Sequence, residues 1–108
     1  MSKKVYCVAS FRAKEGKQQE LLETLQALEP MTQREDGCIQ YLVTKHIEHP
    51  NAMGKSFPIV FNEIWASKED FESHCNRPYI TNFFETHCVK EDGLVADFNV
   101  CVYTDEIN

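Results

Sequence analysis

Hydrophobic side chains in this sequence gather in four runs that are separated by polar stretches. Each run is rich in apolar and β-favouring residues and is bounded by glycine, proline or charged side chains. Runs of this kind are typical of β-strands. The pattern predicts four strands, over residues 4–13, 38–47, 58–66 and 95–103.

The segment between the first two runs predicts a helix. Gly16 ends the first strand, and leucines then recur on one helical stripe, at Leu21, Leu22, Leu25 and Leu28. Pro30 is expected to break or kink this helix near its last turns. Asp36 and Gly37 form a turn signal that ends the segment.

A second helical region follows the third strand. Ser67 is a typical N-cap residue and is followed by acidic side chains, which favour a helix start. Pro78 interrupts this helix and suits the first turn of a new one, which carries Tyr79 and Phe83. The polar connection over residues 48–57 is longer than a tight hairpin, so we expect it to form a mobile flap.

The predicted order is therefore strand, helix, strand, strand, helix, strand. This order, with an antiparallel hairpin in the middle, predicts an α+β protein with the ferredoxin-like split β-α-β arrangement. A chain of 108 residues forms one domain by default, so residues 1–108 are expected to be a single domain. Residues 104–108 are expected to be a short polar tail.

Alternation in the third strand suggests that the sheet has a partner. It puts Phe61, Glu63 and Trp65 on one face and Asn62 on the other. Helices cover one face of such a sheet, and a second face that carries Phe61 and Trp65 is poorly suited to water. We expect a second copy to pack across it, giving a homodimeric α+β barrel with a pocket inside; an irregular core with a satisfied carboxylate is the alternative.

Charge and composition narrow the possible partners. Seventeen acidic and eleven basic side chains give a net charge of −6, which disfavours binding to nucleic acid or to an anionic membrane. We see no apolar run of the length that spans a bilayer and no signal peptide, so a soluble, cytoplasmic protein is expected. The five cysteines contain no Cys-x-x-Cys pair and are interpreted as small buried residues rather than disulfides.

The stretch from Glu63 to Tyr79 has a residue pattern that points to a particular protein family. An acid stands two residues before Trp65, a Ser-capped acidic helix follows, and His74 lies nine residues past the tryptophan. With Tyr79 shortly after, this pattern resembles the antibiotic biosynthesis monooxygenase family. The turns around Gly16 and Gly37 are also similar to that family, and the resemblance covers nearly the whole chain.

The resemblance implies a dimeric α+β barrel and a class of chemistry. Family members of the oxygenase type oxidise electron-rich phenols or hydroquinones with O₂ and use no metal or organic cofactor. Such a reaction needs a dry pocket, a base for the phenolic proton and donors that hold the anion. We therefore expect a cofactor-independent monooxygenase acting on a small phenolic or quinol-type aromatic.

Three residues are the catalytic candidates. His74 is the expected base, because an imidazole titrates nearest neutral pH. Trp65 is expected to wall the pocket and stack on a flat ring. Glu63 is expected to orient His74 or bind a substrate hydroxyl, and a structural pairing with a cation across the dimer is the alternative. Weaker candidates for substrate binding are Phe61, Asn62, Tyr79 and Asn99.

Other functions remain open at this point. The pairs His74-Cys75 and His87-Cys88 invite a zinc site, but their spacing matches no usual zinc motif, and no metal site is expected. Relatives of this fold also degrade haem, using an Asn on the first strand where this chain has Val8-Ala9-Ser10. Haem binding or degradation is thus one alternative, and a non-catalytic, ligand-binding stress protein is another.

Overall fold

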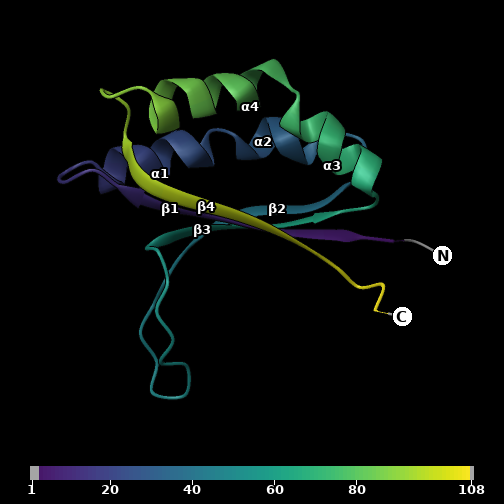
Figure 1. The fold of residues 1–108 in the computed structure, drawn as a ribbon, viewed down its shortest axis with the longest axis horizontal. Helices are drawn as coiled ribbons and strands as arrows, with labels where there is room; N and C mark the ends of the chain where they lie inside the picture. Colours follow the sequence, from purple (N-terminus) through teal and green to yellow (C-terminus); the bar gives the residue numbers. More distant parts are fainter. Residues whose placement is uncertain (1–2, 108) are drawn as a thin grey trace.

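Four antiparallel strands form one sheet in the order β2-β3-β1-β4 (Figure 1). The structure is a computed structural model that describes residues 3–107. Its strands are β1 (Val5–Ala13), β2 (Cys38–Lys45), β3 (Ile59–Trp65) and β4 (Val95–Thr104). The four predicted strands are confirmed to within a few residues, and so is the ferredoxin-like α+β class.

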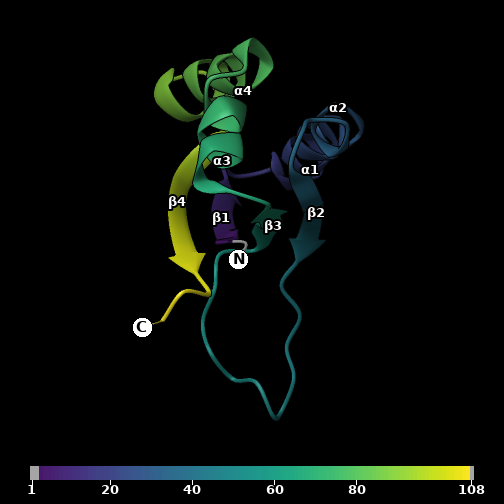
Figure 2. The same ribbon diagram turned by 90° about the vertical axis from the view of Figure 1, so that its right-hand side faces the viewer.

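All the helices lie on one face of the sheet (Figure 2). They are α1 (Gln18–Gln26), α2 (Glu29–Gln33), α3 (Lys68–Cys75) and α4 (Pro78–Phe83), and α4 continues into a π-helical segment, η1 (Phe84–Val89). The helix predicted after Gly16 is split in two, and Pro30 lies in the first turn of α2, where its missing N–H leaves no helical bond unmade. No helix within residues 3–107 has the length and apolarity that a membrane crossing requires.

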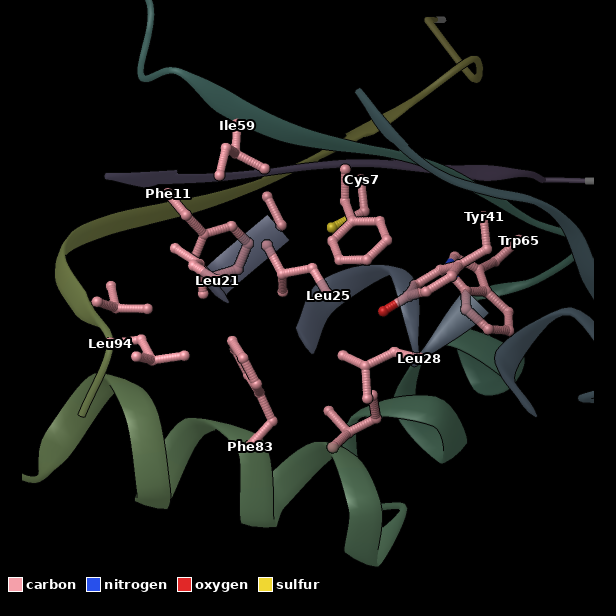
Figure 3. Close-up of a cluster of buried hydrophobic side chains, with 14 residues drawn as sticks. Cys7, Phe11, Leu21, Leu25, Leu28, Tyr41, Ile59, Trp65, Phe83 and Leu94 are labelled. Carbon is pink, nitrogen blue, oxygen red and sulfur yellow. The ribbon is translucent and has the colours of Figure 1, made fainter. Parts of the chain in front are cut away.

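The hydrophobic core lies between the helices and the sheet (Figure 3). The inward-facing residues of β1 pair with those of β3, so that Cys7 lies beside Glu63 and Ala9 beside Phe61. Leu21 and Leu25 of α1 pack against this layer, and neither is exposed to solvent. The predicted leucine stripe is therefore the buried face of α1.

The expectation that a second copy covers the sheet face with Phe61 and Trp65 is wrong. Phe61, Glu63 and Trp65 do share a face, but the helices of the same chain cover it, and all three are at most 6 % exposed. A period of two shows which residues share a face, but not which of the two faces the helices cover. The cavity near these residues therefore lies inside one chain rather than between two copies.

The opposite face of the sheet has no helix from the described part of the chain. It carries outward-facing residues of β1, β2 and β3, among them Val8, Leu42 and Val60, which are half-buried or exposed. The predicted flap between β2 and β3 extends away from the helix layer in Figure 1. The cavity and the β2–β3 connection thus lie on different sides of the sheet.

Candidate functional site

A cavity of about 380 Å³ lies between the sheet and helices α1, α3 and α4. Most of its lining is apolar, with contributions from Ala9, Phe61 and Phe83. Polar groups enter it from Glu63 and His74, and from four other side chains near its walls or rim: Tyr41, Cys75, Thr81 and Glu85. A mostly apolar concave site with a few polar groups is typical of small-molecule binding sites.

The cavity reaches the surface at one end. Its lining includes exposed residues of α4, η1 and β4, namely Thr81, Glu85, Val89 and Val100. These side chains surround a mouth between η1 and the edge strand β4. A small molecule can therefore enter from the helix side of a single subunit.

The start of α3 determines where His74 lies. The Ser67 hydroxyl accepts a hydrogen bond from the Asp70 backbone N–H at 3.1 Å, and this cap fixes the first turn of the helix. His74 lies almost two turns farther along and faces the sheet, with only 4 % of its surface exposed. The turn before β2 supports the same helix start, because Gly37 has a φ of +78° and a side chain there would collide with Asp70.

Two aromatic rings hold the imidazole of His74. The Trp65 indole lies against it, with ring centroids 4.6 Å apart and planes inclined by 33°. Tyr41 approaches with its edge, at a centroid distance of 5.3 Å. Tyr41 also lies against Phe61, with centroids 4.4 Å apart, so one aromatic cluster connects the cavity wall to the histidine.

Glu35 is the carboxylate that contacts His74. Its side chain is only 6 % exposed, and Oε2 lies 3.2 Å from His74 Nδ1. The Tyr79 hydroxyl donates a short hydrogen bond to the same oxygen, and Arg77 Nε lies 3.5 Å from Oε1. Three residues of one short segment, at positions 74, 77 and 79, therefore converge on a carboxylate that comes from the turn before β2.

Burial dominates the proton affinity of His74. It lowers the pKa of the imidazole below the ordinary value of 6.5, although the neighbouring Glu35 carboxylate acts in the opposite direction. The positive charge of Arg77 lowers the pKa further. The ring is therefore neutral at pH 7 and has a free lone pair with which it can accept a proton.

The pKa of Glu63 is shifted in the opposite direction to that of His74. Burial raises the pKa of its carboxyl to about 7, although hydrogen bonds from Trp65 and Cys7 favour the charged form. Trp65 Nε1 donates to Glu63 Oε1 at 3.0 Å. Near neutral pH this carboxyl is present in both protonation states, so it can accept or donate a proton inside the cavity.

The structure brings some of the predicted site residues together and separates others. Phe61, Glu63 and His74 line the cavity. Asn62 and Asn99 lie on the opposite face of the sheet, where Asn62 Nδ2 donates to Thr44 Oγ1 at 3.0 Å and Asn99 packs near Cys101. Neither asparagine lines this cavity, because alternation points their side chains away from it, and Asn99 lines a second hollow on the open face of the sheet.

Trp65 and Tyr79 lie close to the site but do not line the cavity. Trp65 is completely buried behind Glu63 and His74, so the expectation that it forms a wall against the substrate is wrong. Tyr79 uses its hydroxyl on Glu35 instead of on the cavity. Trp65 contacts Glu63 and His74, which line the cavity, whereas Tyr79 contacts Glu35, which in turn contacts His74.

Sequence reasoning missed Glu35 and Tyr41. Glu35 stands beside Asp36 in a turn, and nothing in the local pattern distinguishes the buried acid from its exposed neighbour. The period of two in β2 places Tyr41 on the face that pairs with Glu63, but it does not show that Tyr41 contacts His74. Their contacts with His74 become visible only when α3 packs against β2 and the turn before it.

The cavity does not fit haem. Haem carries two carboxylates, which need cationic or other donor groups, but no lysine or arginine of the described residues lines this cavity, and Glu63 and Glu85 do. His74 is enclosed by Trp65 and Glu35. We therefore derive no haem chemistry for this site. Within residues 3–107 no three His, Cys, Asp or Glu side chains gather closely enough to share a metal ion.

Comparisons with known proteins agree with this architecture. The family model described as antibiotic biosynthesis monooxygenase matches residues 4–86. A protein from Shewanella oneidensis has a similar structure, with a TM-score of 0.79 and 33 % sequence identity, covering 97 % of this chain and 93 % of its own. No curated protein matches the chain.

Two more distant structures share the fold. A proposed antibiotic biosynthesis monooxygenase from Deinococcus radiodurans has a TM-score of 0.74 and 20 % identity, and the match covers 92 % of this chain and 89 % of that one. A protein with a ferredoxin-like fold from Mesorhizobium loti has a TM-score of 0.71 and 14 % identity, with coverage of 94 % and 95 %. At these identities the likeness concerns the fold alone.

Proposed function

The chain belongs to the antibiotic biosynthesis monooxygenase family, and we propose that it oxidises a small phenolic or quinol-type aromatic with O₂ inside the cavity, without a metal or an organic cofactor. Family membership supports monooxygenase-type chemistry in general. The observation that carries the specific proposal is a neutral, buried His74 that lines an apolar cavity and has Glu35 on its Nδ1 side.

The first step is removal of the phenolic proton. His74 accepts this proton, and the resulting phenolate is electron-rich enough to react with O₂ directly. Phe61 and Tyr41 line the cavity and offer flat surfaces on which an aromatic ring can stack. The apolar lining excludes water, which protects the anion and the oxygen adduct from side reactions.

The remaining steps balance without another reductant. The phenolate carbon para to the oxygen adds O₂ and forms a C–O bond, and the peroxide oxygen takes a proton from the protonated form of Glu63. The C–H proton at that carbon then passes to the Glu63 carboxylate while the O–O bond breaks, which forms a carbonyl group. The hydroxide that leaves takes the proton held by His74, so the phenol and O₂ yield a quinone and water.

Trp65 supports both acid–base groups. Its indole N–H donates to Glu63, and its ring lies against His74, so a single side chain fixes the orientation of both. A positioned donor and acceptor contribute to catalysis because the geometry is set before the substrate arrives. We therefore propose Trp65 as a positioning residue and not as a stacking surface.

We also propose that two copies pair through the open face of the sheet. Proteins of this family are commonly dimeric. The face opposite the helices carries half-buried or exposed apolar side chains, including Val8, Leu42 and Val60, which a second sheet would cover. This arrangement leaves the cavity and its mouth accessible on the helix side of each subunit.

The decisive experiment is O₂ uptake by purified, metal-free protein supplied with 1-naphthol, a phenol whose carbon para to the hydroxyl carries the hydrogen that the mechanism removes. We expect His74→Gln to lower kcat/KM by about 10²–10⁴-fold, the usual contribution of a general base. His49→Gln is the matched control, because His49 lies in the exposed β2–β3 connection, and it should leave turnover unchanged. Burial holds the pKa of His74 below 6.5 and raises that of Glu63 to about 7, so activity should fall below pH 6.5, as the base becomes protonated, and above pH 7, as the acid becomes ionised.

Four outcomes would overturn the proposal. Turnover that requires added metal or flavin would contradict the cofactor-free mechanism, and unchanged kinetics of His74→Gln would exclude His74 as the base. Binding of phenols without O₂ uptake across a substrate panel would indicate a non-catalytic ligand-binding protein. A saturating Soret band on titration with hemin would show that the haem alternative is correct.

A further inference from the structure

We propose that Glu35 is a positioning residue that holds His74 as its Nδ1–H tautomer, so that Nε2 is the nitrogen that faces the cavity with a free lone pair. The effect on turnover rests on the proposed function, but the tautomer itself does not. Neither Glu35 nor any residue near it carries a sequence signal for this role, and only the packing of the turn before β2 against α3 reveals it.

The direction of the hydrogen bond follows from the chemistry of the two groups. A carboxylate accepts hydrogen bonds and has no proton to donate, whereas a neutral imidazole carries one N–H and one lone pair. His74 Nδ1 lies 3.2 Å from Glu35 Oε2 and 3.3 Å from Oε1, so Nδ1 must carry the proton. Nε2 then has the lone pair.

The Glu35 carboxyl is surrounded by hydrogen-bond donors. Arg77 Nε lies 3.5 Å from Oε1, and a guanidinium can only donate. The Tyr79 hydroxyl donates to Oε2 and has a single proton, so Thr32 Oγ1, 3.1 Å from the Tyr79 oxygen, must donate to it in turn. Thr32 is completely buried and Tyr79 is half-buried, so the Thr32 end of this chain of donors is shielded from water.

The ring is also fixed on its other sides. Trp65 lies against one face of the imidazole and Tyr41 approaches with its edge, so rotation that exchanges Nδ1 and Nε2 is blocked. None of the hydrogen bonds within the described residues involves Nε2. Because His74 lines the cavity, this nitrogen is left for a bound molecule.

Titration of His74 depends on the charged and ionisable groups that surround it. Glu35 approaches from the turn before β2, and Arg77 and Tyr79 approach from the start of α4. Tyr41 of β2 contacts the ring, and Glu63 of β3 lies in the same cavity. Of these groups, Glu35 favours the protonated imidazole and Arg77 opposes it, so removal of the Glu35 charge should lower the pKa of His74.

The test is ¹⁵N NMR of the histidine rings, because ring nitrogen shifts distinguish the two neutral tautomers without any substrate. We expect His74 in the wild-type protein to be mainly the Nδ1–H form at pH 8. Glu35→Gln should shift the population toward Nε2–H and lower the pKa of His74. Glu72→Gln removes the same charge from an exposed position on α3 and should change neither quantity.

Kinetics provide a second readout. Glu35→Gln should lower kcat by about 10-fold or more with little change in KM, because it alters the base and not the apolar contacts. Glu35→Asp keeps the charge and should retain the Nδ1–H tautomer and part of the activity. If Glu35→Gln proves unstable, Tyr79→Phe takes its place in the test. This variant keeps the carboxylate, removes one hydrogen-bond donor and should retain the Nδ1–H tautomer.

The outcomes separate this inference from the proposed function. A wild-type His74 that is mainly Nε2–H, or a Glu35→Gln protein that stays Nδ1–H, would overturn the role of Glu35 whatever the activity. Absence of O₂ uptake with an Nδ1–H His74 that responds to Glu35→Gln would overturn the proposed function and leave this inference standing.

Discussion

The indole nitrogen of Trp65 donates a hydrogen bond of 3.0 Å to Oε1 of Glu63, its neighbour on the same face of β3. Both side chains are buried on the helix-covered side of the sheet. The bond gives a buried carboxyl a donor that does not itself titrate, and it places the tryptophan behind the cavity.

Replacement of Trp65 by Phe should raise the pKa of Glu63 above its value of about 7, because the indole hydrogen bond favours the charged carboxylate. ¹³C NMR titration of the glutamate carboxyl carbons measures this shift. Tyr41→Phe keeps both hydrogen bonds of Glu63 and is the control. Trp65→Phe should also lower the free energy of unfolding by about 1–3 kcal/mol. A lower Glu63 pKa in Trp65→Phe would contradict the assigned bond.

Stability should depend on pH through Glu63. Its pKa is about 4.5 in the unfolded chain and about 7 in the folded protein, so the protonated form favours folding. The stability it supports is complete below pH 4.5 and is lost as the pH rises through 7. Compared with Glu63→Gln, the wild-type protein should lose about 3 kcal/mol across this window.

Urea unfolding at a series of pH values checks this prediction. Glu72→Gln is the control, since this exposed acid on α3 should give a nearly constant difference from the wild-type protein. A constant difference between the wild-type protein and Glu63→Gln would mean that the buried carboxyl titrates normally.

The cavity should prefer uncharged aromatics. No lysine or arginine among the described residues lines it, whereas Glu63 and Glu85 do. A buried ligand carboxylate would lack a cationic partner, so 1-naphthoate should bind at least about 10-fold more weakly than 1-naphthol at pH 8. Isothermal titration calorimetry measures both affinities.

Glu63→Gln should narrow this difference in affinity, because it removes a negative charge from the cavity wall. Equal binding of the two ligands by the wild-type protein would show that the aromatics bind elsewhere. Asp97→Asn, on an exposed part of β4, is the control and should leave the preference intact.

Leu42→Glu should disrupt the proposed dimer. Leu42 is 48 % exposed and lies on the open face of β2, where a charge would have to be buried against the second copy. Sedimentation equilibrium should give the mass of two chains for the wild-type protein and of one chain for the variant. Val89→Glu, equally apolar but on the helix side, should keep the dimer mass. A wild-type protein with the mass of a single chain would contradict the pairing.

Much of the fold was predictable because its signals are local. The four strands follow from apolar runs, α1 from the leucine stripe, and α3 from the Ser67 cap; each depends on residues within a few positions of one another. The same holds for Phe61, Glu63 and Trp65, whose common face follows from the period of two in a strand. These features therefore did not require tertiary information.

The sequence by itself determined the order of the elements, the family and two catalytic candidates, Glu63 and His74. Only the tertiary structure decided which face of the sheet the helices cover, and so placed the cavity inside one subunit. It also paired His74 with Glu35, 39 positions away in the sequence. Contacts over such separations depend on how whole elements pack, and no short-range pattern encodes them.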